Sequence, residues 1–504
     1  MNYVIGEMRR ASTFLTRTLR SRTIKRLTNG GPDSAGETIF ALSSGQGKCG
    51  VAVIRVSGPA SALALRSLTG PRQSFPTPRK AFLRSIIHPH SEEMLDRGLV
   101  LWFPGPRSFT GEDCAELHIH GGPAVISGVL EALGSLSSLR PAEAGEFTRR
   151  AFHAGKLDLT EVEGLGDLIH AETEAQRRQA LRQMAGDLGR LYHDWSQRLT
   201  RCLAHVEAFI DFSEDELIED GVLNQVDESL SQLVREIEGH LSDERKGERL
   251  RSGVQVVIAG ATNAGKSSLL NLLCQRPAAI VSPVAGTTRD VVETCVDIGG
   301  FPILLSDTAG LRDTQDTVEI EGVRRARERV QQADLALVVV DSSKLPRDPR
   351  HVAASLGGQL GEVLSGQASQ RCLLVLNKSD LLSEEQSRGI QSALRERGDL
   401  PQACLLSCHT DSGVNGFLSV LKNSVQILCG DPLVGGPSLT QARHRAHLLE
   451  CVRSLAQYRQ YRDLDLALAA EGVRLALIGL GRITGRVGAE EILDIIFRDF
   501  CIGK

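Results

Sequence analysis

The stretch Val254-Gln-Val-Val-Ile-Ala-Gly-Ala-Thr-Asn-Ala-Gly-Lys-Ser267 decides the fold of the central part of this chain. A short apolar run, Val254–Ala259, leads into a GxxxxGKS loop and then into residues suited to a helix over 268–273. In this strand–loop–helix context the backbone N–H groups of the loop can wrap around phosphates. We expect Lys266 to meet the β- and γ-phosphate oxygens and Ser267 to bind Mg²⁺.

Apolar runs alternate with helical patterns downstream of this loop. The runs, each of strand length, are Ile303–Ser306, Leu335–Val340, Leu373–Leu376 and Cys404–Leu406. Such alternation indicates a parallel, doubly wound α/β sheet. A Gly/Pro cluster over 430–437 closes this region, and helical patterns resume from 439 to 496. The sequence therefore predicts an α/β domain inserted into a helical one.

Two further motifs follow predicted strands and specify the nucleotide. Asp307-Thr-Ala-Gly310 is a DxxG sequence, which places an acid near the metal and a flexible glycine under the γ-phosphate. Asn377-Lys-Ser-Asp380 is an NKxD sequence, whose aspartate can accept hydrogen bonds from N1 and the exocyclic amine of guanine. Adenine cannot supply that pair of donors. We therefore predict a GTPase, with Ser407 in the loop behind the base.

One departure from the Ras pattern concerns hydrolysis. Leu311 follows the DxxG motif where Ras-like enzymes carry a glutamine that orients water. Asn263, three residues before Lys266, could hold a monovalent cation against the phosphates. Glu319 is a candidate to orient the water, although from the residues alone it could equally be an acid on a helix surface. The switch threonine that completes the Mg²⁺ shell is expected in Gly286-Thr-Thr-Arg-Asp290.

Composition limits the classes of protein that the chain can belong to. It has 504 residues, of which 41% are hydrophobic and 24% charged, enough for about three domains with their own cores. The net charge of -4 argues against a global basic field for nucleic acids. No apolar run approaches the roughly 18 residues of a membrane span. The 11 scattered cysteines favour a reducing compartment over a disulfide framework, and no histidine pair completes a zinc site around Cys404 and Cys408.

The parts before the α/β domain differ in character. Residues 1–30 are rich in arginine, serine and threonine and carry one acid, which is typical of a mitochondrial transit peptide; a disordered basic arm is the alternative. Residues 38–150 read as strand-rich, with strands at Val51–Val56 and Glu116–His120. Residues 157–250 read as helical, with Leu199, Leu203, Val206 and Ile210 on one helix face. The acidic stretch over 211–220 is interpreted as a solvated helix junction.

These motifs, together with the terminal Phe500-Cys-Ile-Gly-Lys504, resemble the MnmE/TrmE tRNA-modification GTPases. The resemblance extends through nearly everything after residue 37. It includes Phe109-Thr-Gly-Glu-Asp113, His120-Gly-Gly-Pro123, Ala144-Gly-Glu-Phe-Thr148 and Lys156-Leu-Asp-Leu159. With its Arg-rich leader the chain looks like a mitochondrial member of the family.

The resemblance implies a multidomain α/β and α+β architecture. It comprises an N-terminal folate-binding α+β domain and a helical domain interrupted by a Ras-like, doubly wound P-loop GTPase domain. The implied divisions are a transit peptide and linker over 1–36, the folate-binding and dimerisation domain over 37–152, the first helical part over 153–250, the GTPase domain over 251–432, and the second helical part with its C-terminal CIGK over 433–504.

The resemblance also implies a function. Family members form homodimers whose GTPase is activated by K⁺ when two G domains meet. With an FAD-containing MnmG-type partner, they use a one-carbon tetrahydrofolate (5,10-methylene- or 5-formyl-tetrahydrofolate) to modify C5 of wobble uridine 34 in tRNA. In animal mitochondria the added group is taurinomethyl. The expected location is the mitochondrial matrix, without membrane insertion.

Site residues follow from the resemblance position by position. The catalytic residues would be Glu319, which falls on the family's water-orienting glutamate, with Asn263 and Lys266. Mg²⁺ would be bound by Ser267 and Thr288, and K⁺ by Asn263, Ser282, Val284 and Thr287. The GTP-binding set is Asn263, Ala264, Gly265, Lys266, Ser267, Ser268, Ser282, Val284, Gly286, Thr287, Thr288, Asp307, Thr308, Ala309, Gly310, Asn377, Lys378, Asp380 and Ser407.

The implied folate contacts are Arg55, Glu112, Lys156 and Lys504. Arginine and lysine suit the carboxylates of the cofactor, and glutamate can accept from its pterin ring. A structural ion pair is the alternative for Arg55. Cys501 is either a nucleophile toward uridine C6 or an inert packed thiol.

Two other functions stay open on the sequence. A ribosome-assembly GTPase shares the switch motifs but would not explain the folate-type N-terminal domain. A folate-dependent aminomethyltransferase would not need the intact NKxD motif.

Overall fold

The computed structural model describes residues 36–45, 47–212, 221–275, 293–307, 329–363, 371–396 and 400–488, and then 493, 496, 497, 500 and 503. The chain divides into two compact units, one made of residues 1–156 with 493–504 and the other of residues 157–492. The predicted transit peptide lies outside the described residues, apart from Gly36. Within the described part, none of the helices has the length and apolar character needed to cross a bilayer.

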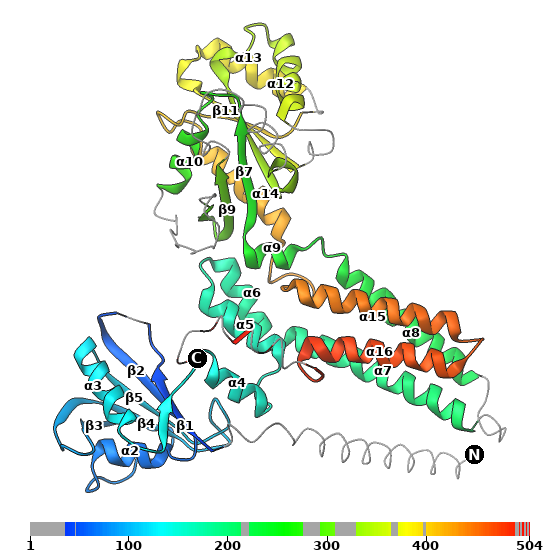
Figure 1. Ribbon diagram of the computed structural model, residues 1–504. Coiled ribbons are helices and arrows are strands. Elements are labelled where there is room, and N and C mark those ends of the chain that lie inside the picture. Colours follow the sequence, from blue (N-terminus) through cyan, green and yellow to red (C-terminus); the bar gives the residue numbers. More distant parts are fainter. Residues whose placement is uncertain are drawn as a thin grey trace, which may run out of the picture. The chain divides into compact units, whose positions relative to one another are not determined.

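The first unit is built on a mixed sheet with strand order β3-β4-β5-β2-β1-β6 (Figure 1). Its strands are β1 (Thr38–Leu42), β2 (Cys49–Ser57), β3 (Phe82–Ile87), β4 (Met94–Phe103), β5 (Cys114–Gly121) and β6 (Leu139–Pro141). Its helices are α2 (Ser61–Thr69), α3 (Pro123–Gly134) and α4 (Glu146–His153). The predicted strands Val51–Val56 and Glu116–His120 are confirmed as the central parts of β2 and β5.

Alternation along these strands places helices on both faces of the sheet. Leu65 of α2 and Leu133 of α3 pack with Ile54 and Leu117 in the larger core. On the other face, Phe147 of α4 packs against residues of β1, the strand beside β6. Helices α2 and α3 therefore cover one face of the sheet, and α4 covers the part of the other face beside β1.

The last residues of the chain pack on this same unit. Phe497 and Phe500 are buried, and their rings lie 6.0 Å apart between centroids. The Arg149 guanidinium lies 5.2 Å from the centre of the Phe497 ring. The Ser43 hydroxyl, directly after β1, donates a hydrogen bond of 2.8 Å to the carbonyl oxygen of Gly503. Gly503 is thus held beside the end of β1.

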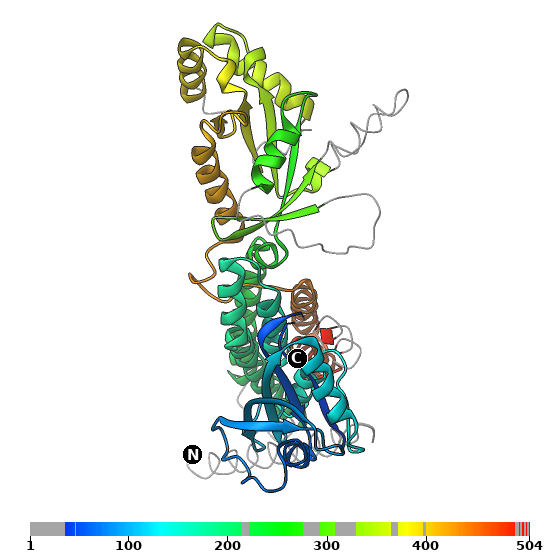
Figure 2. The same ribbon diagram turned by 90° about the vertical axis from the view of Figure 1, so that its left-hand side faces the viewer.

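The second unit contains an α/β domain, whose strands and helices Figure 2 shows from a second direction. Its strand order is β12-β11-β10-β7-β9-β8. Its strands are β7 (Val254–Gly260), β8 (Glu293–Ile298), β9 (Phe301–Asp307), β10 (Leu335–Asp341), β11 (Cys372–Asn377) and β12 (Ala403–Leu405). Its helices are α10 (Lys266–Cys274), α12 (Pro349–Val363), α13 (Glu384–Glu396) and α14 (Val414–Cys429), with 3₁₀ turns η3 (Ser342–Lys344) and η5 (Ser379–Leu381).

The pairing of these strands confirms the doubly wound sheet predicted from the apolar runs. The strands pair in parallel, except that the edge strand β8 is antiparallel to β9. Alternate residues of β7 and β10 enter two separate cores, one on each face of the sheet. Because both faces are buried, these strands read as continuous apolar runs. The carboxyl ends of the parallel strands meet along one edge, where ligands of such sheets bind.

The rest of the second unit is a helical domain. Its helices are α5 (Leu159–His170), α6 (Glu174–Met184), α7 (Asp187–Phe212), α8 (Gly221–Leu241), α9 (Lys246–Ser252), α15 (Ala442–Tyr461) and α16 (Leu466–Thr484). The predicted helix face on α7 is confirmed, because Leu199 and Val206 are buried and Leu203 and Ile210 pack against the same core. Helices α15 and α16 come from after the α/β domain, so the predicted insertion is also confirmed (Figure 1).

A buried polar group joins the two sequence halves of the helical domain. Glu163 of α5 accepts from Arg443 at 2.5 Å and from His444 at 2.8 Å, both on α15. Burial raises the pKa of Glu163, but the charges and hydrogen bonds of His444 and Arg443 outweigh burial and lower it to about 2. Replacing either partner would leave a buried carboxylate poorly compensated.

A histidine in this bundle should make its stability depend on pH. His240 of α8 lies against the rings of Tyr192 and Trp195, and burial lowers its pKa to about 4 from 6.5. Between these two pH values the unfolded chain binds a proton that the folded chain does not. The stabilisation present above pH 6.5 is therefore lost as the pH falls toward 4, by at most about 3 kcal/mol.

Urea unfolding at pH 7 and pH 5 measures this effect. Trp195 fluorescence, in a Trp102→Phe background, reports on the helical domain alone. We expect the His240→Gln variant to lose less stability than its parent between the two pH values. Equal losses would contradict the role of His240.

Candidate functional site

The phosphate-binding loop occupies the predicted place between β7 and α10. Gly265 lies where an added Cβ would come within 2.1 Å of the Asn377 side-chain nitrogen, so only glycine fits there. The ammonium of Lys266, at the start of α10, donates to the carbonyl oxygens of Gly260 and Ala261 at 3.0 and 2.9 Å. This geometry places a positive charge over the loop, at the N-terminus of a helix, and suits a polyphosphate.

Three other predicted residues take part in this loop. Asn263 has a left-handed backbone conformation, with φ of 61°, and its side chain is exposed. Ala264 is buried, and its carbonyl oxygen accepts from the Asn377 amide at 3.0 Å. Ser267 is exposed in the first turn of α10, beside Lys266, where a Mg²⁺ ligand is required.

The NKxD segment lies at the carboxyl end of β11 and is held by hydrogen bonds to neighbouring segments. The Asn377 side chain joins the phosphate loop to the segment after β12, because its oxygen also accepts from the backbone N–H of Cys408 at 3.1 Å. The Ser407 hydroxyl is fully buried and donates to the Asp380 carboxylate at 2.5 Å. Ser407 thus orients the carboxylate that the sequence assigns to the base.

Lys378 has a partner that the sequence analysis missed. Its ammonium lies 2.7 Å from the carboxylate of Asp341, the last residue of β10. Burial raises the pKa of Asp341, but hydrogen bonds from Lys378 and Ser343 outweigh burial and lower it. Lys378 has a positive φ of 65°, so the ion pair fixes a backbone conformation that lysine seldom adopts. The position of Asp341 directly after an apolar run is the signal that could have found it.

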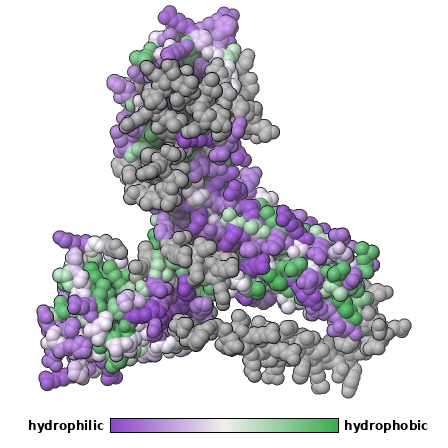
Figure 3. Space-filling view, viewed as in Figure 1, coloured by the Kyte–Doolittle hydropathy of each residue, from purple (hydrophilic) through white to green (hydrophobic). Residues whose placement is uncertain are grey.

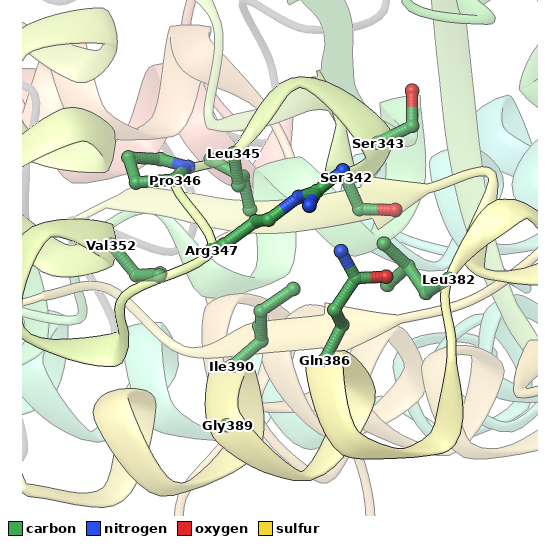
Figure 4. A pocket seen from close by; sticks show the side chains of 10 residues that line it. All are labelled: Ser342, Ser343, Leu345, Pro346, Arg347, Val352, Leu382, Gln386, Gly389 and Ile390. Atoms are coloured by element: carbon green, nitrogen blue, oxygen red, sulfur yellow. The ribbon is translucent and has the colours of Figure 1, made fainter.

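Two hollows lie in the α/β domain. One, of about 510 Å³, is lined by Ser268 and Asn271 of α10 and by Cys408, His409 and Asp411 after β12. It adjoins both the phosphate loop and the base-binding segment. The other lies between η3 and α13 and has a volume of about 10 Å³, which is room for one water molecule (Figure 4). The smaller hollow has no room for a nucleotide, and of the predicted GTP contacts the larger one is lined by Ser268.

Other predicted residues of this site cannot be placed. The side chain of Asp307 is not described, although its backbone ends β9 at the expected edge of the sheet. The following residues lie outside the described part of the chain: Ser282, Val284, Gly286, Thr287, Thr288, Thr308, Ala309, Gly310 and Glu319. Their roles stay predictions.

Of the folate candidates in the first unit, Arg55 has a structural partner. Its guanidinium donates to the Glu116 carboxylate at 3.0 and 3.1 Å and lies 5.2 Å from the centre of the Phe109 ring. The ion pair that the sequence left open as an alternative is thus present. Contact between Arg55 and a folate stays a prediction.

Glu112 and Lys156 lie near one another through Gly111. A Cβ on Gly111 would come within 3.6 Å of the Lys156 Cε atom, and Lys156 is exposed. Glu112 accepts from the Ser57 hydroxyl at 2.7 Å and from Arg150 at 3.0 Å. Its side chain keeps 31% of its surface exposed, so part of the carboxylate can still reach a ligand.

The predicted site at the chain end is only partly described. Lys504 and Cys501 lie outside the described residues. Gly503 has a φ of +100°, and a Cβ there would be 2.1 Å from the Leu42 carbonyl oxygen. This close approach requires glycine and brings the penultimate residue against the end of β1.

The described residues offer no cluster of side chains suited to a metal ion. None of their histidine, cysteine, aspartate and glutamate side chains form a group of three that could hold a metal ion. Cys404 and Cys408 are free thiols, and burial raises the pKa of each to about 11.

Comparison with known proteins gives matches along almost the whole chain. Residues 38–156 match the family model described as the GTP-binding protein TrmE N-terminus, and residues 159–501 match that of the MnmE helical domain. Over 497 residues the chain is 70% identical to a Danio rerio protein named 5-taurinomethyluridine tRNA synthase subunit GTPB3, mitochondrial, with 98% of each chain covered.

Relatives from other organisms carry similar names. The Homo sapiens protein of the same name is 58% identical over 485 residues, with 96% of each chain covered. The tRNA modification GTPase MnmE of Parvibaculum lavamentivorans is 49% identical over 473 residues, which are 93% of this chain and 100% of the bacterial one.

Proposed function

Because the chain belongs to the MnmE/TrmE family of tRNA-modification GTPases, we propose that it is the GTP-hydrolysing subunit of a mitochondrial enzyme that modifies wobble uridine 34 of tRNA. The observation that carries the proposal is the hydrogen bond from the Asn377 side chain to the Ala264 carbonyl oxygen, which joins the NKxD segment to the phosphate loop. The names of the vertebrate relatives support mitochondria as the location and taurinomethyl as the added group. A ribosome-assembly GTPase would leave the match over 38–156 unexplained.

The residues of the α/β domain have distinct tasks in this reaction. Lys266 neutralises phosphate charge, while the loop N–H groups and the start of α10 hold the phosphates in place. Asp380, oriented by Ser407, accepts from the guanine base. Ser267 and the predicted Thr288 would hold Mg²⁺, which would supply further neutralisation of phosphate charge.

Activation by K⁺ is the part of the proposal that follows from Leu311 and Asn263. Leu311 replaces the water-orienting glutamine, and no arginine finger is expected in this family. The exposed Asn263 side chain stands in the phosphate loop, where its amide oxygen suits a monovalent cation. Ser282, Val284 and Thr287 would complete its shell.

Exchanging KCl for NaCl at equal ionic strength tests this role. Charge neutralisation in the transition state is worth about 10³–10⁵ where an arginine supplies it. Loss of the cation should therefore lower GTP turnover by about tenfold or more, measured as phosphate release. Equal turnover in the two salts would remove K⁺ from the mechanism.

A reduced one-carbon folate is the proposed cofactor of the first unit. Its residues fit such a ligand, because a partly exposed carboxylate, Glu112, directly follows Gly111, the exposed Lys156 lies beside Gly111, and Gly503 is held beside β1. The folate supplies the carbon that is transferred to uridine. Glu112 would accept from the pterin ring, and Arg55, Lys156 and Lys504 would meet its carboxylates.

Deleting residues 501–504 should weaken folate binding by about ten- to a hundredfold. The reason is loss of one charge-assisted contact from Lys504, worth about 1.5–3 kcal/mol. Isothermal titration with 5-formyl-tetrahydrofolate measures the change. Intrinsic GTP hydrolysis serves as the control for folding and should survive the deletion. Unchanged folate affinity would show that the tail is not part of the site.

Homodimer formation has a candidate surface in the first unit. Leu83 of β3 and Leu99 of β4 are directly paired across the strands and are 52% and 41% exposed. Val51 of β2 is 60% exposed. An exposed apolar sheet face of this kind favours burial against another protein surface, and green apolar areas are visible on this unit in Figure 3.

An FAD-containing MnmG-type protein is the second proposed partner. Its support is that the vertebrate relatives are named as a subunit of a synthase, which implies a complex.

A further inference from the structure

The Glu112 carboxylate is held by donors from two separate segments of the first unit. Ser57, the last residue of β2, donates its hydroxyl to Oε2 at 2.7 Å. Arg150, on α4, donates Nη1 to Oε1 and Oε2 at 3.2 and 3.0 Å. A carboxylate that receives these donors is an acceptor only, so whatever binds its exposed part must bring its own N–H or O–H groups.

The Ser57 hydroxyl that donates to Glu112 is itself fixed by a buried chain of hydrogen bonds. Ser57 and Thr110 are fully buried, and their hydroxyl oxygens lie 2.7 Å apart. Since Ser57 gives its single proton to Glu112, Thr110 must donate to Ser57. The Cys114 sulfur lies 3.2 Å from the Thr110 oxygen and closes the chain. The direction of every hydroxyl is thus determined by the carboxylate.

The arginine partner is fixed by a second chain of charges. Arg150 Nη2 donates to Glu146 Oε1 at 2.9 Å, and Arg140 donates to both oxygens of Glu146, at 2.7 and 2.9 Å. Arg140 also donates to Glu37 at 2.6 Å. The side chains of Arg150 and Glu146 are each only 10% exposed. The Glu146 carboxylate therefore fixes the orientation of the Arg150 guanidinium, which donates to the Glu112 carboxylate.

The Ala144-Gly-Glu-Phe-Thr148 motif, which the sequence singled out without a role, builds this arrangement. An added Cβ on Gly145 would lie 2.6 Å from the Phe497 carbonyl oxygen, so the C-terminal segment packs directly on the motif. Glu146 holds Arg150, and the Phe147 ring centre lies 5.8 Å from the Arg55 guanidinium. The motif thus contacts three parts of the proposed folate site.

We propose that Arg150 is a positioning residue for Glu112, held by Glu146 so that the exposed part of the Glu112 carboxylate accepts an N–H donor of a heterocyclic ligand. This inference rests on the folate proposal, and the pterin ring, with its ring amide N–H and exocyclic amine, has donors of that class. Arginine is suited to the task because its planar guanidinium serves two carboxylates from fixed directions, which lysine cannot do. The hydrogen bonds from Ser57 and Arg150 leave the exposed part of the Glu112 carboxylate to accept from a ligand.

Titration of the full chain with 5-formyl-tetrahydrofolate tests the role of Arg150. Loss of a residue that orients a ligand-binding group costs about ten- to a hundredfold in comparable sites. We expect Arg150→Ala to weaken binding by that factor and Arg150→Lys to weaken it by about tenfold. Arg84→Lys is the matched control, because the contacts of Arg84 on β3 are with the Phe82 ring and the backbone of Leu83 and Ser74, outside the Glu112–Arg150–Glu146 network. It should change the affinity by less than about twofold.

A double-mutant cycle separates positioning from a general structural effect. If Arg150 acts through Glu112, the Arg150→Lys change should cost less than about twofold in a Glu112→Gln background. Additive losses, or equal losses from Arg150→Lys and Arg84→Lys, would overturn the role of Arg150. Unchanged affinity in both Arg150 variants would overturn it as well, while the folate proposal would stand. Absence of binding to the wild-type chain would overturn the folate proposal and this inference together.

Discussion

Replacing Asp380 with asparagine should lower the affinity for GTP by about a hundred- to ten-thousandfold. In the proposed function this carboxylate accepts two charge-assisted hydrogen bonds from guanine, each worth about 1.5–3 kcal/mol. An asparagine amide would face the exocyclic amine with its own N–H group. Xanthine has a carbonyl oxygen at that position, so the variant should prefer xanthosine triphosphate. Displacement of a fluorescent nucleotide by GTP and by xanthosine triphosphate measures the exchange.

Ser407→Ala is the matched control for this prediction. It removes the hydroxyl that donates to Asp380 at 2.5 Å but leaves the carboxylate in place. We expect a loss of GTP affinity of about tenfold at most, without any gain for xanthosine triphosphate. If Asp380→Asn bound GTP normally, or bound neither nucleotide while remaining folded, the base would not be read by this residue.

Glu319→Ala should lower GTP turnover by about 10²–10⁴ with little change in GTP affinity. A group that orients the attacking water acts in the transition state, so its loss appears in kcat rather than in binding. Leu311, which follows the DxxG motif, has no polar side chain and therefore cannot orient the water in place of Glu319. Single-turnover hydrolysis and nucleotide titration of the same preparation separate the two effects.

A neighbouring acid provides the control for Glu319. Glu321 lies two residues further along the chain, and Glu321→Ala changes the net charge by the same amount. It should hydrolyse GTP at the normal rate. Normal hydrolysis by Glu319→Ala, or a loss of nucleotide binding in place of turnover, would return Glu319 to the alternative of a surface acid.

The sheet of the α/β domain was predictable where its strands are buried on both faces. The runs at Val254–Ala259, Leu335–Val340 and Leu373–Leu376 correspond to β7, β10 and β11 within one residue at each end. Strand β8 was not predicted. It is an edge strand in which Val296 and Ile298 are buried and polar residues alternate with them, so its sequence, Glu-Thr-Cys-Val-Asp-Ile, has no continuous apolar run.

The site was predictable to the extent that its contacts are local. The phosphate loop and NKxD residues stand at strand ends, where position in the sequence fixes position in the fold. The partners that hold them come from distant segments and have no fixed spacing. The pairs Asp341–Lys378 and Glu112–Arg150 are separated by 37 and 38 residues, and only the folded strands and helices bring them together.

Mass spectrometry of the wobble nucleosides of mitochondrial tRNA is the most direct measurement of the central claim. The comparison is between cells that lack this protein and the same cells supplied with the wild-type chain or the Asp380→Asn variant. We expect the C5-modified uridine to disappear without the protein, to return with the wild-type chain and to stay absent with the variant. Undiminished modification in cells without the protein would contradict a role for this GTPase in wobble-uridine modification.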